Sequence, residues 1–139
     1  MNEVTTLAFI LKTVPYKEND RLVYAYTKEF GKLTFIAKGV NKLTSKNAYS
    51  LQELTLVEMT VIPKKRISTF IKANIVEFYR FIKEDIVLQV YSSYIMEYIY
   101  KQEEENNPNE EVFNLIFDAM NALLKGYPPK LGLFSSSCL

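Results

Sequence analysis

The spacing of apolar residues changes near residue 80, and this change constrains the fold more than any other feature of the sequence. Before it, apolar residues alternate with polar ones, or run almost continuously as in strands buried on both faces. After it, they recur at intervals of three and four residues, which is typical of helices. The sequence therefore predicts a β part followed by an α part.

Five segments before this change have the pattern of strands: residues 7–14, 21–27, 33–38, 54–62 and 67–78. Pro15 is expected to end the first strand, and the short link Lys28–Gly31 predicts a hairpin between the second and third. Every link is short except the one after Gly39, which favours a small barrel over an open sheet. The five-stranded, partly open barrel that binds oligonucleotides is the expected architecture for residues 1–80.

Two helices are predicted after the change. The first covers Lys83 to Glu105, with an acidic end that is expected to fray, and the second follows Asn109, a favourable N-cap, and closes at Lys125. Residues 81–126 are thus expected to form the first two helices of an incomplete helical domain, and residues 127–139 an irregular tail. Two broad apolar faces need a further surface, which is the barrel, a second copy or other helices. Self-association through these faces is expected.

Cations gather in the first part of the chain. Residues 1–80 contain 13 Lys and Arg against 7 Asp and Glu, a net charge of +6, so the remainder of this +1 chain carries −5. This asymmetry favours a polyanion as the partner of the first part, and phosphate contacts as the mode of binding. The candidate contacts lie in the link after Gly39, in the predicted turn before the fifth strand, and on the second and third strands. They are Lys38, Lys42, Lys46, Lys64, Lys65, Arg66, Arg21 and Lys32.

Two plainer readings of these features remain open. The basic link and the basic turn are also what solvated connections between strands look like. The sheet aromatics Tyr24, Tyr26 and Phe35 are candidate platforms for stacking bases, but aromatics of a small barrel also fill its core.

The residue inventory argues against catalysis. Histidine is absent and Cys138 is the only cysteine, which removes Cys–His and Ser–His nucleophile pairs, internal disulfides and most zinc sites. Carboxylates such as Glu103 to Glu105 are expected to be solvated. We predict no enzyme activity and no cofactor. Without a signal sequence or an apolar run of membrane length, a cytoplasmic location is expected.

Several short motifs, taken in their order and spacing, resemble the RecO family of bacterial recombination mediators between about Leu7 and Gly126. The motifs are Ala8-Phe9-Ile10-Leu11, Phe30-Gly31-Lys32, Ala37-Lys38-Gly39-Val40 followed by Lys42, Ser45 and Lys46, Ile82-Lys83-Glu84-Asp85, and Asn107-Pro108. The resemblance implies an N-terminal OB-fold and a helical domain. It also implies binding of single- and double-stranded DNA, strand annealing without nucleotide hydrolysis, and action with RecR-like and SSB-like proteins and RecA.

The sequence departs from the family pattern at three points. Asn41 stands where the family often has Arg or Lys, the four-cysteine zinc module of many members is missing, and the chain ends where members continue through further helices. A C-terminal truncation with an incomplete SSB site is therefore expected. The expected function is a DNA-binding and annealing module of recombinational repair. The alternative is a protein-interaction module whose helical face docks a partner without binding DNA.

Overall fold

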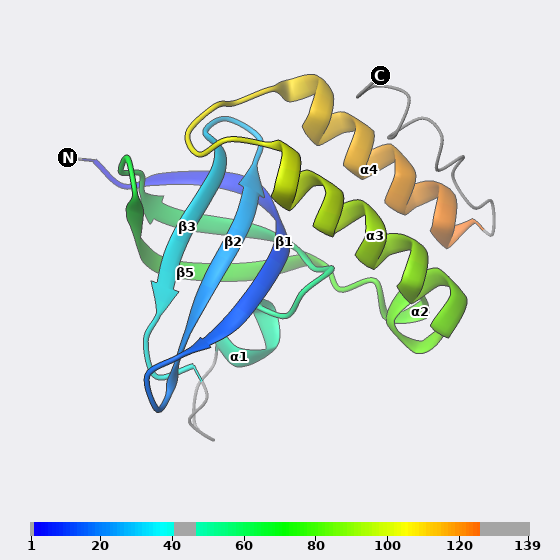
Figure 1. Cartoon of the computed structure of the whole chain (residues 1–139), viewed down its shortest axis with the longest axis horizontal. Helices are drawn as coiled ribbons and strands as arrows, with labels where there is room; N and C mark the ends of the chain where they lie inside the picture. Colours follow the sequence, from blue (N-terminus) through cyan, green and yellow to red (C-terminus); the bar gives the residue numbers. More distant parts are fainter. Residues whose placement is uncertain (1, 41–46, 126–139) are drawn as a thin grey trace.

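The computed structural model describes residues 2–40 and 47–125, and in this part of the chain five strands form a closed barrel with helices on one side (Figure 1). The order around the barrel is β1-β2-β3-β5-β4, and β4 returns to pair with β1. The strands are β1 (Val4–Tyr16), β2 (Asp20–Thr27), β3 (Gly31–Ala37), β4 (Leu56–Ile62) and β5 (Ile67–Glu77). The predicted five-stranded barrel and its β-then-α order are confirmed.

The alternation of side chains along the strands separates two apolar clusters. One cluster fills the barrel, with Ala8 and Ile10 of β1 next to inward residues of the other strands. The second lies outside the barrel beneath the helices and takes Phe9 and Leu11 from the same strand. The continuous apolar run of β1 is therefore explained, as predicted, by burial on both faces.

Two of the strand limits that differ from the sequence prediction have a clear structural cause. Pro15 does not end β1, because it pairs with Arg21 near the end of the β1–β2 hairpin, where a proline is tolerated. Leu54 is not part of β4, because its backbone is left-handed, with φ 68°. The Leu54 N–H nevertheless donates to the Ile10 carbonyl at 3.1 Å, so this bend still holds the chain against β1.

The helices are α1 (Asn47–Ser50), α2 (Arg80–Glu84), α3 (Ile86–Gln102) and α4 (Glu110–Leu124). The single helix predicted from Lys83 is wrong, because Asp85 separates two helices. Its backbone is extended, and its carboxylate accepts the N–H groups of Val87 and Leu88 as the N-cap of α3. The predicted N-cap Asn109 is confirmed, because its side-chain oxygen accepts the Glu111 N–H at 3.1 Å.

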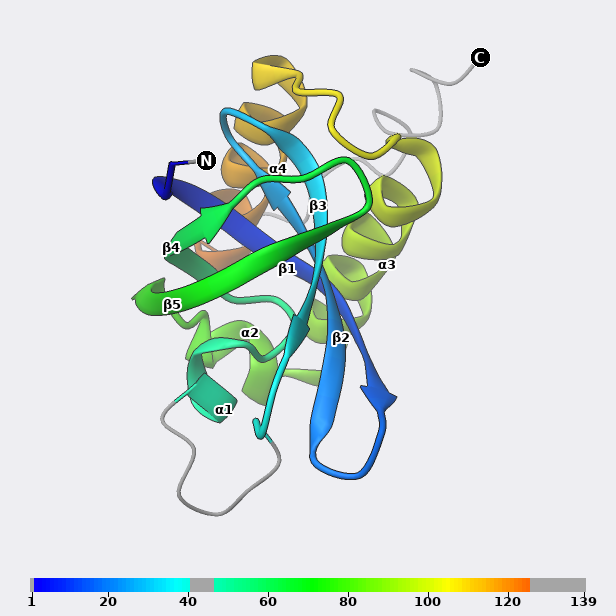
Figure 2. The same ribbon diagram turned by 90° about the vertical axis from the view of Figure 1, so that its left-hand side faces the viewer.

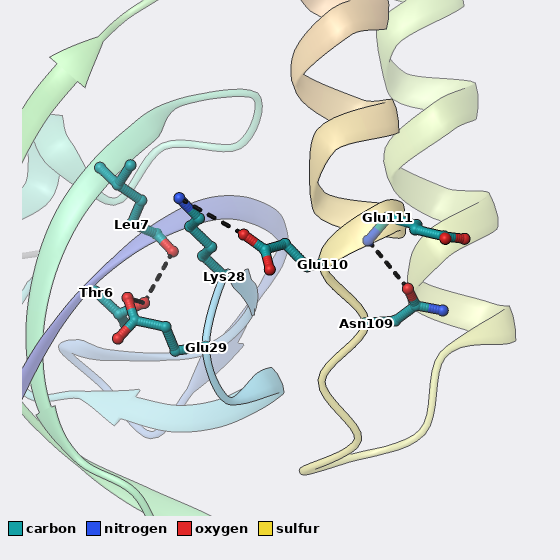
Figure 3. A network of polar contacts seen from close by, with 7 residues as sticks. All are labelled: Thr6, Leu7, Lys28, Glu29, Asn109, Glu110 and Glu111. Atoms are coloured by element: carbon teal, nitrogen blue, oxygen red, sulfur yellow. Dashed lines mark hydrogen bonds and ion pairs between the residues drawn. The ribbon is translucent and has the colours of Figure 1, made fainter.

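The α3–α4 connection is bound to the barrel rather than frayed. The Tyr26 hydroxyl on β2 donates to the Asn109 carbonyl and accepts the Asn109 N–H, at 3.2 and 3.1 Å. Nearby, Lys28 lies 3.9 Å from the Glu110 carboxylate, while Thr6 and Glu29 form a separate contact on the barrel side (Figure 3). The first turn of α4 is thereby fixed to the β2–β3 hairpin.

Candidate nucleic-acid interface

The junction of β3 and β5 is the weakest seam of the barrel. The two strands are parallel and pair only at Thr34 with Ile67 and at Phe35 with Ser68. Figure 2 shows β5 crossing β3 steeply, so the strands diverge beyond this short contact. A hollow of about 470 Å³ opens along the seam, and we call it the β3–β5 groove. Its lining residues are Ile36, Lys38, Lys64, Ile67, Ser68, Thr69, Phe70 and Ile71.

The groove combines two cations with an apolar floor. Lys38 follows the end of β3 and Lys64 precedes the start of β5, and both are exposed. Between them lie aliphatic side chains and the ring of Phe70, which stacks on Phe35 with centroids 4.9 Å apart. Ammonium groups beside an apolar and aromatic floor suit a strand that presents both phosphates and bases.

The other predicted cations fall into three groups. Lys65 and Arg66 are exposed in the β4–β5 turn, next to the groove residue Lys64. Lys42 and Lys46, like Asn41, lie outside the described residues. Arg21 and Lys32 are not in the groove. Arg21 lines another hollow, and Lys32 donates to the Tyr100 carbonyl of α3 at 2.9 Å, with its ammonium 5.0 Å from the Tyr100 ring.

Two of the three aromatics proposed from the sequence are not available for stacking bases. Tyr26 and Phe35 are fully buried, the first beneath the helices and the second inside the barrel. Tyr24 packs edge-on against Tyr100 at 4.8 Å. The groove aromatic is instead Phe70, which the sequence analysis did not single out, although it lies in a predicted strand next to the basic turn.

The acidic end of α3 is not simply solvated, contrary to the sequence prediction. Thr34 of β3 donates a hydrogen bond to the Glu105 carboxylate, and the Asn106 N–H donates to the Lys32 carbonyl at 3.0 Å. Burial raises the pKa of Glu105, against the opposing effects of the Thr34 hydrogen bond and the Lys32 charge. Glu105 therefore ties the α3–α4 connection to the barrel and takes no part in the β3–β5 groove.

Lys83 is a cation that the candidate list lacks. Its ammonium donates to the Thr55 hydroxyl at 2.7 Å and to the Phe78 carbonyl. Burial lowers the pKa of this amine to about 8, with Arg80 acting in the same direction and Glu77 against it. A single lysine at a helix start gives no sequence signal for such an environment.

Neither a metal centre nor a membrane span is found in the described part of the chain. Among residues 2–40 and 47–125, no three His, Cys, Asp or Glu side chains come together in a group able to hold a metal ion. None of the helices described there combines the length and apolarity needed to cross a bilayer.

Comparisons with known proteins agree on one family. The family model described as Recombination protein O N terminal matches residues 1–79. DNA repair protein RecO of Listeria monocytogenes serotype 4b is 30% identical over 122 residues, which cover 88% of this chain and 48% of that protein. The protein of the same name from Caldicellulosiruptor bescii is 26% identical over 131 residues, covering 94% and 54%. That of Bacillus mycoides is 27% identical over 122 residues, covering 88% and 49%.

The match extends over both parts of the fold. The family model covers all five strands of the barrel, and the alignments with the relatives are long enough to include helical residues as well. The chain spans about half the length of these curated relatives. Since the family model alone matches more than half of the chain, this protein belongs to the RecO family, and its barrel is the N-terminal OB-fold of that family.

Proposed function

We propose that this protein is a non-enzymatic DNA-binding and strand-annealing protein of recombinational DNA repair, and that the β3–β5 groove holds DNA by its phosphates. The observation that carries the proposal is the groove itself, where Lys38 and Lys64 flank an apolar floor. The relatives are named DNA repair proteins, which supports the same role. Annealing and action with RecR-like and SSB-like proteins come from the family resemblance and form part of the proposal.

The proposed DNA contacts extend from the groove into its basic surroundings. Lys65 and Arg66 continue the positive charge along the β4–β5 turn, and Lys42 and Lys46 follow Lys38 in the sequence. The contacts are to phosphates rather than base edges, because Lys and Arg on turns fix a backbone without reading sequence. Little sequence preference is therefore expected.

A salt titration of single-strand binding tests the proposal. Each lost phosphate contact is expected to lower the slope of log affinity against log salt by about 0.7. The Lys38→Gln, Lys64→Gln double variant should therefore lose about 1.4 of slope, whereas the matched Lys101→Gln, Lys125→Gln variant on the helices should keep the wild-type slope. Equal slopes in both double variants would contradict the assignment of the groove as the DNA site. An affinity that does not depend on salt would contradict binding through phosphates.

The second candidate is a protein-interaction module, and one observation favours it. The surface formed by α2 and the first half of α3 exposes large apolar side chains, including Phe81 and Ile86, each 76% exposed. A second copy of this chain is the occupant we assign to this face, because the residues that line it are all uncharged and two such faces can pair without burying a charge. The interaction-only reading predicts no DNA binding, so the same titration separates the two candidates.

A further inference from the structure

A second hollow of the described structure, about 540 Å³, shares no lining residue with the β3–β5 groove. It is bounded by the ends of β1 and β2, by the segment between α1 and β4, and by α2 and α3. Its polar lining contains two cations, Arg21 and Lys83, and one carboxylate, Glu53, together with the side chains of Gln52, Gln89 and Ser93. We call it the Arg21–Lys83 cavity.

Arg21 keeps most of its hydrogen-bonding capacity free. Its Nε and Nη2 atoms both donate to one acceptor, the Thr13 hydroxyl, at 3.2 and 2.9 Å. No carboxylate lies within ion-pair distance of this guanidinium among the described residues. Since a guanidinium has five N–H donors, several remain for a ligand with oxygen acceptors.

Lys83, on α2, lines the same cavity. Both of its hydrogen-bond acceptors, the Thr55 hydroxyl and the Phe78 carbonyl, are neutral, and its ammonium lies 3.4 Å from the centre of the Phe78 ring. An ammonium has three donors, so one is left. Burial lowers the pKa of this amine and the charge of Glu77 offsets that effect only in part, so a bound anion would further favour the charged form.

Glu53 does not neutralise this pair of cations. It brings one negative charge against two positive ones, and one of its carboxylate oxygens accepts the Thr13 N–H at 2.8 Å. The cavity therefore keeps a net positive charge from the two cations. Amide and hydroxyl groups of Gln52, Gln89 and Ser93 add neutral hydrogen-bonding partners.

The cavity lies close to the groove along the chain. Lys38 lines the β3–β5 groove and Val40 lines the Arg21–Lys83 cavity. Two residues of chain span at most about 7 Å, so the backbone of a groove residue and that of a cavity residue lie close together just after β3. α1 contributes Ala48 to the cavity wall. A strand bound at Lys38 is therefore near a residue of the cavity.

We propose that the Arg21–Lys83 cavity binds a phosphate group, and that this phosphate belongs to a DNA strand continuing out of the β3–β5 groove. Two cations and several neutral donors lining one cavity fit the several oxygens and the charge of a phosphate. The strand assignment rests on the proposed function, whereas the phosphate chemistry of the cavity stands on its own contacts.

The first test compares Lys83→Gln with Lys101→Gln, which removes the same charge from α3 outside both hollows. The expected result is a loss of about 0.7 from the salt slope of single-strand binding in Lys83→Gln only, with recovery in Lys83→Arg. Glu53→Gln is expected to have the opposite effect on affinity. It keeps an acceptor for the Thr13 N–H but removes a negative charge that repels the phosphate, so strand binding should tighten roughly two- to fivefold. Equal slopes in Lys83→Gln and Lys101→Gln overturn the proposal, as does weaker binding by folded Glu53→Gln.

A second arm separates failure of this proposal from failure of the proposed function. If the wild-type chain binds no strand, the function fails, and inorganic tripolyphosphate then tests the cavity alone. A rise in melting temperature with tripolyphosphate that Lys83→Gln loses and Lys101→Gln keeps supports a phosphate site with a free polyphosphate as its ligand. No rise in the wild-type protein overturns the phosphate site.

Discussion

Tyr26 and Tyr79 are both fully buried, and their hydroxyl groups have opposite surroundings. The Tyr26 hydroxyl exchanges hydrogen bonds with the Asn109 backbone, whereas the Tyr79 hydroxyl has no partner among the described residues. Removing a satisfied buried hydroxyl costs about 1 kcal/mol or more, while removing an unsatisfied one relieves a desolvation cost of similar size. We therefore expect Tyr26→Phe to lower the free energy of unfolding and Tyr79→Phe to leave it unchanged or raise it.

Denaturant unfolding of the two variants measures this difference, because each change deletes one oxygen from a buried ring. The two substitutions act as controls for each other. Equal losses of stability in both variants would contradict the prediction, since they would mean that the Tyr79 hydroxyl is as well bonded as that of Tyr26.

At the scale of elements, the contact between β3 and the α3–α4 connection depends on Gly31. Its φ is +72°, and a Cβ atom built there would lie 2.6 Å from the Asn107 carbonyl carbon and 2.8 Å from the Pro108 nitrogen. Both are backbone atoms, so the connection has to move if Gly31 gains a side chain. Gly31→Ala is expected to destabilise the fold by at least about 1 kcal/mol from the left-handed backbone alone, with the clash in addition.

Hydrogen exchange shows whether this effect is local. The Asn106 N–H donates to the Lys32 carbonyl and should exchange faster in Gly31→Ala. The α4 amides around Ile116 lie in the shared core and serve as the internal reference. An unchanged rate at Asn106 in a folded variant would show that the connection accommodates the extra carbon.

The elements that sequence reasoning predicted correctly are those with a long periodic pattern. Alternation along β2 and β3 was sufficient to predict both strands, and the Asn109 cap marked the start of α4. The four-residue α1 has no period to detect, and the short α2 lies before the apolar stripe that predicted α3, which begins at Ile86.

The same limit applies to the candidate site. The sequence indicated Lys38 and Lys64 as separate cations in a link and a turn, and only the parallel crossing of β3 and β5 brings them to one groove. Phe70 and Lys83 were missed for the same reason. Their roles come from residues distant in the chain, Phe35 for the first and Thr55 for the second, and no local pattern encodes such neighbours.

At the scale of the whole molecule, the barrel covers only one side of the helices. The outer surface of α3 carries Ile86, Val87, Val90 and Tyr94 around a hollow of about 440 Å³, and Val90 is 63% exposed. An apolar surface of this kind favours association in water.

We therefore expect the 139-residue chain to form dimers or larger species, with a light-scattering mass above the monomer mass of 16.2 kDa. Val90→Lys should bring the light-scattering mass back to that of the monomer. A lysine at an exposed helix position is tolerated, but burying its charge in an interface is costly. Asn114→Lys on the exposed face of α4 adds the same charge elsewhere and should associate like the wild type. A monodisperse wild-type monomer at tens of micromolar, or equal masses for the two lysine variants, would show that this face is not the contact surface.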